Sequence, residues 1–267
     1  MRWAAAAALL VALAGPAATA DAHSLVRKQG GTVRYLARDA TSLNALTIRA
    51  AGRSIVLRDT EVAGGIDPGP CRPVDVSTRT FDVVEVRCRA AARVVAELGD
   101  REDRATSGVP AELRGGAGSD ELQGSPAADG LHGGDGSDRL HGGDGADRLT
   151  GGTGKDKLIG GLGKDSFVFA AVPNAKTNVD LVADFSSRDD TFLLDNKYLK
   201  KVGKDGRLLK DAFFLGAKAH DAEDRVIYDK AKGALYYDPD GTGHGAAIKL
   251  AVLTNKATLA LSDFLVI

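Results

Sequence analysis

The chain has 267 residues, of which 43% are hydrophobic and 27% are charged, a composition that suits one to three globular domains. Lys and Arg together number 35 and Asp and Glu number 36, so the formal net charge is −1. This balance argues against a nucleic acid or another polyanion as the partner.

The first twenty residues have the pattern of an export signal. Arg2 supplies a short basic start, residues 4–14 form an apolar run, and Ala18-Thr19-Ala20 matches an A-x-A cleavage site. The run is too short for a transmembrane helix, which needs about 20 apolar residues, and no later segment reaches that length. We therefore expect cleavage after Ala20, or after Ala22, and a secreted protein without a transmembrane segment.

Residues 21–97 are predicted to form an N-terminal β cap. Residues 46–48 and 54–57 flank a short turn and are typical of a hairpin, and residues 81–86 alternate as a half-buried strand does. Cys71 and Cys88 are the only cysteines, and in an exported protein a lone pair favours a disulfide over two free thiols. Such a disulfide is worth about 3 kcal/mol in the chain-entropy model.

Six nine-residue units run without a slip from residue 115 to residue 168, on the template GGxGxDxUx, where U is a large apolar residue. Glycine adopts positive φ at no steric cost, so GGxGx can turn tightly and aim several carbonyls at one point. The aspartate that closes each turn adds a carboxylate, and oxygen-only sites with many ligands favour Ca²⁺ over Mg²⁺. Apolar residues at U then stack into a shared core. A flexible Gly/Asp-rich linker, the alternative, has no reason to keep this apolar period.

These units resemble the RTX, or hemolysin-type, calcium-binding repeat. The resemblance implies an all-β fold: a right-handed parallel β-roll over residues 98–168, with two repeats in each eighteen-residue coil and Ca²⁺ between turns of successive coils. The ligands are then the aspartates and turn glycines of the repeats: Asp120, Asp129, Asp138, Asp147, Asp156, Asp165, Gly116, Gly118, Gly134, Gly136, Gly143, Gly145, Gly152, Gly154, Gly161 and Gly163.

The eighteen-residue coil also predicts how many ions the roll holds. Turns that start at residues 115, 133 and 151 stack on one side of the roll, and turns that start at 124, 142 and 160 stack on the other. The first stack should hold two ions, with Asp138 bordering both, and the second should hold one. Ser125 and Ala127 replace glycines in the turn of Asp129, which weakens the remaining interval. We expect three ions, or four if Asp129 rescues that interval, and we expect Asp129→Ala to be close to silent.

The roll is expected to begin before its calcium-binding turns. Residues 106–114 have the spacing of a coil turn without metal ligands, and residues 99–103 have the pattern of a degraded turn that is one residue out of register. The N-terminal cap should therefore lead into the roll without a linker.

Residues 169–267 lack the nine-residue period. Five β-like segments lie in this region, at residues 180–185, 189–194, 224–228, 233–238 and 261–267, and another, at residues 167–169, overlaps the end of the last repeat. This region is similar to the C-terminal domain of serralysin-type proteins, which implies a mostly antiparallel β domain that caps the open end of the roll. Residues 238–243 favour a hairpin turn, with an accessory Ca²⁺ site as the alternative. The last residues also resemble an uncleaved C-terminal secretion signal, which offers a second export route.

The sequence contains no recognised catalytic motif. The HExxH of serralysins, the GxSxG of lipases that carry similar repeats, and a P-loop are all missing. His132 and His141 lie one repeat apart, so we expect them on opposite faces of the roll. The sequence predicts a secreted, non-enzymatic calcium-binding protein. The alternatives are a surface, matrix or adhesion module with structural Ca²⁺, and a hydrolase with its site in the N-terminal region. The sequence names no macromolecular partner.

Overall fold

The computed structural model describes residues 24–29, 32–37, 45–51, 54–59, 66–67, 72–74, 84–89 and 93–267. Residues 1–20 and Cys71 lie outside the described residues, as does the side chain of Cys88, so the export signal and the disulfide stay predictions. No helix in the described part of the chain is long and apolar enough to cross a membrane.

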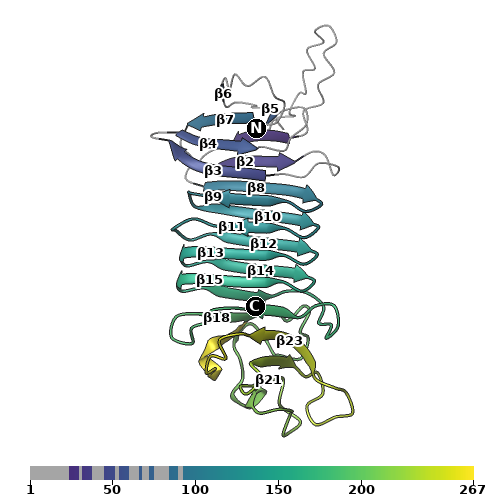
Figure 1. Cartoon of the computed structure of the whole chain (residues 1–267). Coiled ribbons are helices and arrows are strands. Elements are labelled where there is room, and N and C mark those ends of the chain that lie inside the picture. Colours follow the sequence, from purple (N-terminus) through teal and green to yellow (C-terminus); the bar gives the residue numbers. More distant parts are fainter. Residues whose placement is uncertain are drawn as a thin grey trace, which may run out of the picture.

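The described strands form two sheets. In the roll, successive coils of the chain are stacked along one axis, and each coil contributes one strand to each sheet (Figure 1). Sheet 1 has the order β19 (Gly206–Arg207), β24 (Phe264–Val266), β18 (Thr191–Leu194), β16 (Ser166–Phe169), β14 (Arg148–Thr153), β12 (Gly130–Asp135), β10 (Ala111–Ala117), β8 (Arg93–Asp100), β2 (Thr32–Ala37), β1 (Ser24–Gln29) and β5 (Ile66–Asp67). Sheet 2 has the order β20 (Phe213–Leu215), β21 (Val226–Asp229), β22 (Ala234–Tyr237), β23 (Ile248–Leu253), β17 (Asp180–Val182), β15 (Lys157–Gly163), β13 (Arg139–Gly145), β11 (Glu121–Gln123), β9 (Arg104–Ser107), β3 (Ala45–Ala51), β4 (Ser54–Asp59), β7 (Val84–Arg89) and β6 (Arg72–Val74). Two short 3₁₀ helices, η1 (Lys210–Ala212) and η2 (Leu261–Asp263), complete the described elements.

From β8 to β18 the chain alternates between the sheets, and each strand pairs in parallel with the strand one coil later. The register aligns the apolar U residues: Leu113, Leu131, Leu149 and Phe167 in sheet 1, and Leu122, Leu140 and Leu158 in sheet 2. All seven are at most 1% exposed. Because residues alternate along a strand, the neighbours of each U point outward. The predicted eighteen-residue coil and its stacked core are confirmed.

The N-terminal region continues both sheets without a linker. Strand β2 pairs in parallel with β8, and β3 pairs in parallel with β9, while β3 and β4 form the predicted antiparallel hairpin. Gly116 pairs with Gly99, seventeen residues earlier, so the turn at residues 99–103 is one residue short, as the sequence predicts.

The C-terminal region closes the other end of the roll with mixed pairing. Strands β17 and β18 pair in parallel with the last roll strands, and β23 and β24 pair in parallel with them in turn. The expected antiparallel pairing is found between β21 and β22, β22 and β23, and β19 and β24. Phe192 stacks on Phe185 with ring centroids 4.2 Å apart, and both rings contact Phe167. This aromatic cluster covers apolar surface that the last coil of a solenoid would otherwise expose.

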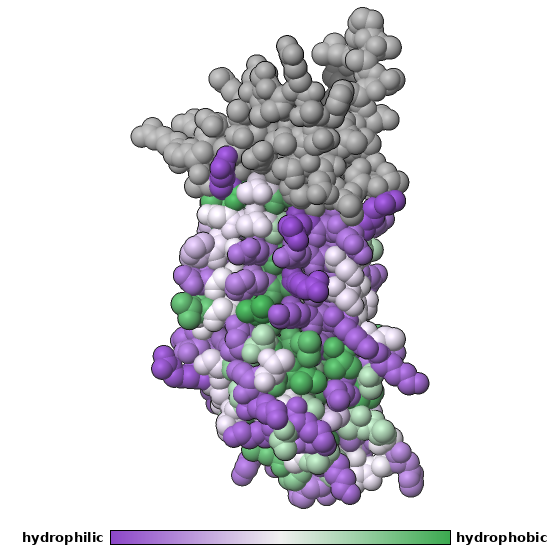
Figure 2. Space-filling view, in the orientation of Figure 1, coloured by the Kyte–Doolittle hydropathy of each residue, from purple (hydrophilic) through white to green (hydrophobic). Residues whose placement is uncertain are grey.

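The outer surface of the roll is largely hydrophilic in the face that Figure 2 shows, and hydrophobic surface gathers toward the C-terminal region. Arg104, Glu121, Arg139 and Lys157 follow one another in register across sheet 2 and are exposed. Arg104 forms an ion pair with Glu121. The charged residues that flank Leu122, Leu140 and Leu158 therefore lie on the outside, and the repeat aspartates lie inside.

Candidate metal centres in the turns of the roll

The turns depend on glycines at the second and fourth positions of the repeats. In five of the six repeats both positions hold glycine with φ between +101° and +138°. A Cβ atom at these positions would overlap backbone atoms of the preceding coil, so successive turns lie in direct contact. At Gly136, for example, it would overlap the carbonyl oxygen of Gly118. Glycine is therefore required both for the conformation and for the close stacking of the turn carbonyls.

The aspartates form two hydrogen-bonded columns along the roll, which we call ladders. The first ladder comprises Asp103, Asp120, Asp138, Asp156 and Asp180, and the second comprises Asp129, Asp147, Asp165 and Asp190. In each step the amide of one aspartate donates to Oδ1 of the aspartate one coil later, as from Asp120 to Asp138 at 2.7 Å. Every ladder aspartate is at most 7% exposed.

In five of the six repeat aspartates the second carboxylate oxygen lacks a protein donor. Oδ2 of Asp120, Asp138, Asp147, Asp156 and Asp165 is buried and has no hydrogen-bond partner among the residues that the structure describes. A Cβ added to Gly133 would meet both Oδ2 of Asp138 and the carbonyl oxygen of Gly151, so oxygens from successive turns flank one point. A buried carboxylate oxygen without a donor is costly. The donor set is all oxygen, which fits a hard cation such as Ca²⁺.

Burial and mutual repulsion act on these carboxylates together. Burial raises the pKa of Asp120 and of Asp147 to about 7, although an amide hydrogen bond opposes the rise and the next aspartate in the ladder adds to it. For the same reasons the pKa of Asp138 and of Asp165 is raised to about 6. Burial also raises the pKa of Asp180 well above its usual value, and the charge of Asp156 raises it further. Both columns therefore favour a neutralising positive charge.

The turn of Asp129 differs from the other five. Its second position is Ser125, whose amide and Oγ both donate to Oδ2 of Asp129, at 2.6 and 2.8 Å. Oδ1 accepts the amide of Ala111 at 2.5 Å. This carboxylate is satisfied by its own turn, which agrees with the sequence-based view that the interval beside it is weak. Asp129→Ala would break three hydrogen bonds, so the expectation that it is close to silent is limited to ion content.

Two further ladder aspartates were missed by the sequence analysis. Asp180 and Asp190 accept the amides of Asp156 and Asp165 at 3.2 and 3.0 Å, as repeat aspartates do. The segments Asp180-Leu181-Val182 and Asp190-Thr191-Phe192 keep the D-x-U spacing of the repeat without its glycine turn. That spacing is the signal that could have found them.

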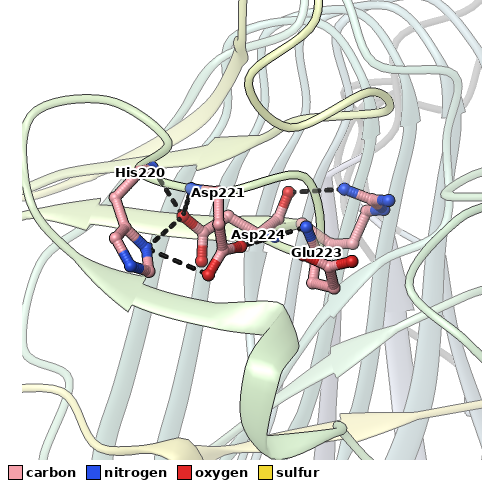
Figure 3. A network of polar contacts seen from close by, with 5 residues as sticks. His220, Asp221, Glu223 and Asp224 are labelled. Atoms are coloured by element: carbon pink, nitrogen blue, oxygen red, sulfur yellow. Dashed lines mark hydrogen bonds and ion pairs between the residues drawn. The ribbon is translucent and has the colours of Figure 1, made fainter.

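No histidine among the described residues belongs to either ladder. His132 lies in β12 of sheet 1 and His141 lies in β13 of sheet 2, which confirms that the two cannot share a site. His220, Asp221 and Asp224 form a separate polar network in a C-terminal loop (Figure 3).

The network of His220 is self-contained. Oδ2 of Asp224 accepts the His220 amide at 2.6 Å, the Asp221 amide at 3.1 Å and a bond from Nδ1 of His220 at 3.1 Å. Burial would raise the pKa of Asp224, but these hydrogen bonds outweigh it and lower the pKa. The His220 ring stacks on Phe214, with centroids 4.6 Å apart. The carboxylate oxygen that faces the ring is already saturated, so we assign the network a role in holding the loop.

The comparison with protein families agrees with the geometry of the turns. The family model for the RTX calcium-binding nonapeptide repeat matches residues 112–140 and 132–167, with four copies. No curated protein matches the chain. The match ends at residue 167, so the similarity of residues 169–267 to the serralysin-type domain stays a prediction. Residues 112–167 therefore contain RTX, or hemolysin-type, calcium-binding nonapeptide repeats, and these repeats form a β-roll.

Proposed function

We propose that the protein is an exported, non-enzymatic calcium-binding protein whose roll folds when it binds Ca²⁺. The observation that carries the proposal is that Oδ2 is buried without a hydrogen-bond partner in five of the six repeat aspartates. Ordering the backbone costs roughly 1–2 kcal/mol per residue, and each nonapeptide has only one large core residue to offset that cost. Metal binding then supplies the missing free energy, so binding and folding are coupled.

Three ions lie between successive turns in this proposal. They occupy the intervals between Asp120 and Asp138, between Asp138 and Asp156, and between Asp147 and Asp165. In each interval the aspartates and the turn carbonyls of both coils serve as ligands, and the ion supplies the positive charge that the buried carboxylates favour. The interval between Asp129 and Asp147 is omitted because Ser125 already donates twice to Asp129.

Removing calcium is expected to unfold the roll. Affinity typical of extracellular modules, about 10⁻⁴–10⁻³ M, would leave the chain without ions at cytosolic calcium levels. Circular dichroism and limited proteolysis of the purified chain should show β signal and protection in millimolar Ca²⁺, and should lose both in excess chelator. Millimolar Mg²⁺ is the control and should not restore them. Full β signal and protection in chelator would contradict the proposal.

Export through the N-terminal segment is expected to need residues 1–20. The basic start, apolar run and A-x-A site support a cleaved signal, and a lone cysteine pair suits an oxidising route. Deleting residues 1–20 should abolish export, and mass spectrometry of the exported protein should find a new N-terminus after Ala20 or Ala22. Export that survives this deletion and is lost instead on deletion of residues 263–267 would reverse the assignment.

The sequence lacks the catalytic motifs that enzymes with similar repeats carry, which supports a non-enzymatic function. Neither HExxH nor GxSxG occurs, and the ladder carboxylates are buried beneath stacked turns rather than open to a substrate. The buried carboxylates between the glycine turns are placed to bind ions, and the charged residues on the outside of the roll are exposed to solvent.

A further inference from the structure

The C-terminal end of sheet 2 contains a hollow that no ladder aspartate lines. Ile227 of β21 and Tyr236 of β22, which pair directly across the two antiparallel strands, line it from the sheet. Two loops form its walls: residues 217–219 follow β20, and residues 241–247 precede β23. The hollow has a volume of about 480 Å³. Small-molecule sites in proteins have volumes of about 300–1,000 Å³, so the hollow is large enough for a small ligand.

The strand pattern explains why these two side chains lie outside the core. Val226 and Tyr228, on either side of Ile227, are buried in the hydrophobic core. Successive side chains of a strand point to opposite faces, so Ile227 and its cross-strand neighbour Tyr236 lie on the outer face. Ile227 is nevertheless fully buried, so neighbouring segments cover it, whereas Tyr236 remains partly exposed. The hollow thus offers an aromatic side chain beside an apolar one.

A buried carboxylate at the end of β22 also lines the hollow. Asp238 is 3% exposed, and its Oδ1 accepts the amides of Asp240 and Gly241 at 3.1 and 2.9 Å. Its Oδ2 accepts no hydrogen bond from the described residues. Burial raises the pKa of Asp238; the two amide bonds oppose the rise, and contact with the Asp240 carboxyl group adds to it. A buried acceptor without a donor is costly, so a ligand that donates a hydrogen bond here would gain free energy.

The wall formed by residues 241–247 is held in place by the rest of the C-terminal region. The amide of Thr242 donates to the carbonyl of Asp221 at 3.1 Å, and the amide of Gly245 donates to Oδ2 of Asp240 at 2.9 Å. Asp221 belongs to the network of His220 that Figure 3 shows, and this network therefore supports the wall. A site that is already ordered loses less conformational entropy when a ligand binds.

The charges around the hollow cancel. Lys218 lines it, and Nζ of Lys249 lies 5.8 Å from the centre of the Tyr236 ring. Asp238 and Asp240 contribute two neighbouring carboxyl groups. A cation would meet the ammonium groups and an anion would meet the carboxyl groups, so neither is favoured by the net charge. The ligand that fits is neutral, with hydroxyl donors on its edge and CH groups on one face.

We propose that this hollow binds a neutral pyranose sugar. Hydroxyl groups of the sugar donate to Oδ2 of Asp238, and the CH face of its ring packs on the side chain of Tyr236. A free sugar and one unit of a neutral polysaccharide offer the same chemistry. The hollow lies outside the roll and includes no turn of the repeats, so the inference goes beyond calcium binding.

The test measures binding of methyl glucopyranoside, methyl mannopyranoside and methyl galactopyranoside to the full chain in millimolar Ca²⁺. Saturation-transfer NMR detects binding, and an NMR titration gives the Kd. The wild-type chain should bind at least one of the three. Asp238→Asn keeps an oxygen for the two amides but loses the second acceptor, so it should weaken binding at least about tenfold. Tyr236→Ala should also weaken binding, because it removes the packing surface.

Tyr198→Ala is the matched control. Tyr198 is also a partly exposed tyrosine beside a lysine, with Nζ of Lys197 4.9 Å from the centre of its ring, but it does not line the hollow. This change should leave sugar binding unaltered. A soluble neutral polysaccharide built from the bound sugar then distinguishes the two sources. Displacement of the glycoside at a lower concentration of sugar units supports a chain as the ligand, and equal displacement supports a free sugar.

Two results would overturn the inference. The first is a wild-type chain that binds none of the three glycosides, or that binds one with an affinity that neither Asp238→Asn nor Tyr236→Ala lowers. The second is an Asp238→Asn chain that loses a calcium ion and keeps its sugar affinity, which would assign the carboxylate to a metal. Tyr236→Ala decides the question if Asp238→Asn fails to fold. The calcium dependence of folding is measured separately, so failure of the proposed function would leave this test intact.

Discussion

Replacing Asp138 with alanine is expected to remove two calcium ions at once and to lower the melting temperature of the calcium-loaded protein sharply. Asp138 accepts the amide of Asp120 and donates its own amide to Asp156, so it borders two intervals of the first ladder. Each ion lost removes about 1–3 kcal/mol of stabilisation when calcium exceeds its Kd by roughly ten- to a hundredfold. Native mass spectrometry and calorimetry at fixed calcium would measure the two losses.

Asp129→Ala is the matched control for this experiment. Asp129 is also a buried repeat aspartate, but its oxygens are held by Ser125 and Ala111. The change should leave the ion count unaltered and should lower stability only through lost hydrogen bonds, at about 1 kcal/mol each. Equal loss of ions from Asp138→Ala and Asp129→Ala would show that the turns pair in another way.

Acid is expected to stabilise the roll in chelator and to destabilise it in excess calcium. Burial raises the pKa of Asp120 and Asp147 from 3.8 to about 7, and that of Asp138 and Asp165 to about 6. The folded chain without calcium then binds more protons than the unfolded chain between pH about 4 and about 7. Its stability is fully present below this window and is lost as the pH rises through it. Protonation thus neutralises the buried carboxylates, as a bound calcium ion does, and stabilises the folded chain in the absence of calcium.

Calcium reverses the sign of this dependence. The ion binds ionised carboxylates, so protons compete with it and stability in excess calcium should fall as the pH falls through the same window. Circular dichroism at about pH 5 and about pH 8 gives the folded fraction in chelator, and urea unfolding gives the stability in millimolar calcium at the same two pH values. Stability that changes in the same direction in both series would contradict the account of the ladders.

The regular part of the fold could be predicted because glycine, aspartate and apolar residues recur at fixed positions of a nine-residue period. Leu140 and Leu158 are in the core since every ninth residue is apolar, and glycines such as Gly136 adopt positive φ because the turn excludes a Cβ atom. The coil length followed from the family resemblance rather than from the residues alone. The structure then confirmed the register that the coil length implies.

The ends of the ladders could not be predicted because they depend on contacts across long insertions. Asp180 and Asp190 lack the glycine turn and lie 24 and 25 residues after Asp156 and Asp165 in the sequence. Only the folded chain shows that they accept the amides of those two residues. The role of Ser125 depends likewise on a backbone without positive φ, which lets its amide reach Asp129. Parallel pairing of β17 and β18 with the roll also needs the tertiary structure, since strand sequences do not encode which edge they meet.

The amide-to-carboxylate bonds of the ladders run in one direction along the chain, so they also set the order in which the coils of the roll can form. Each coil is held by an aspartate that arrives eighteen residues later, as Asp120 is held by Asp138. Eighteen extended residues span about 60 Å, longer than a bilayer is thick. A chain that emerges N-terminus first, from a ribosome or through a pore, therefore cannot lock a turn at the mouth of the exit. Each turn can form its ladder hydrogen bond only after the next coil has emerged, and the segment that is still inside the exit stays extended and free to move.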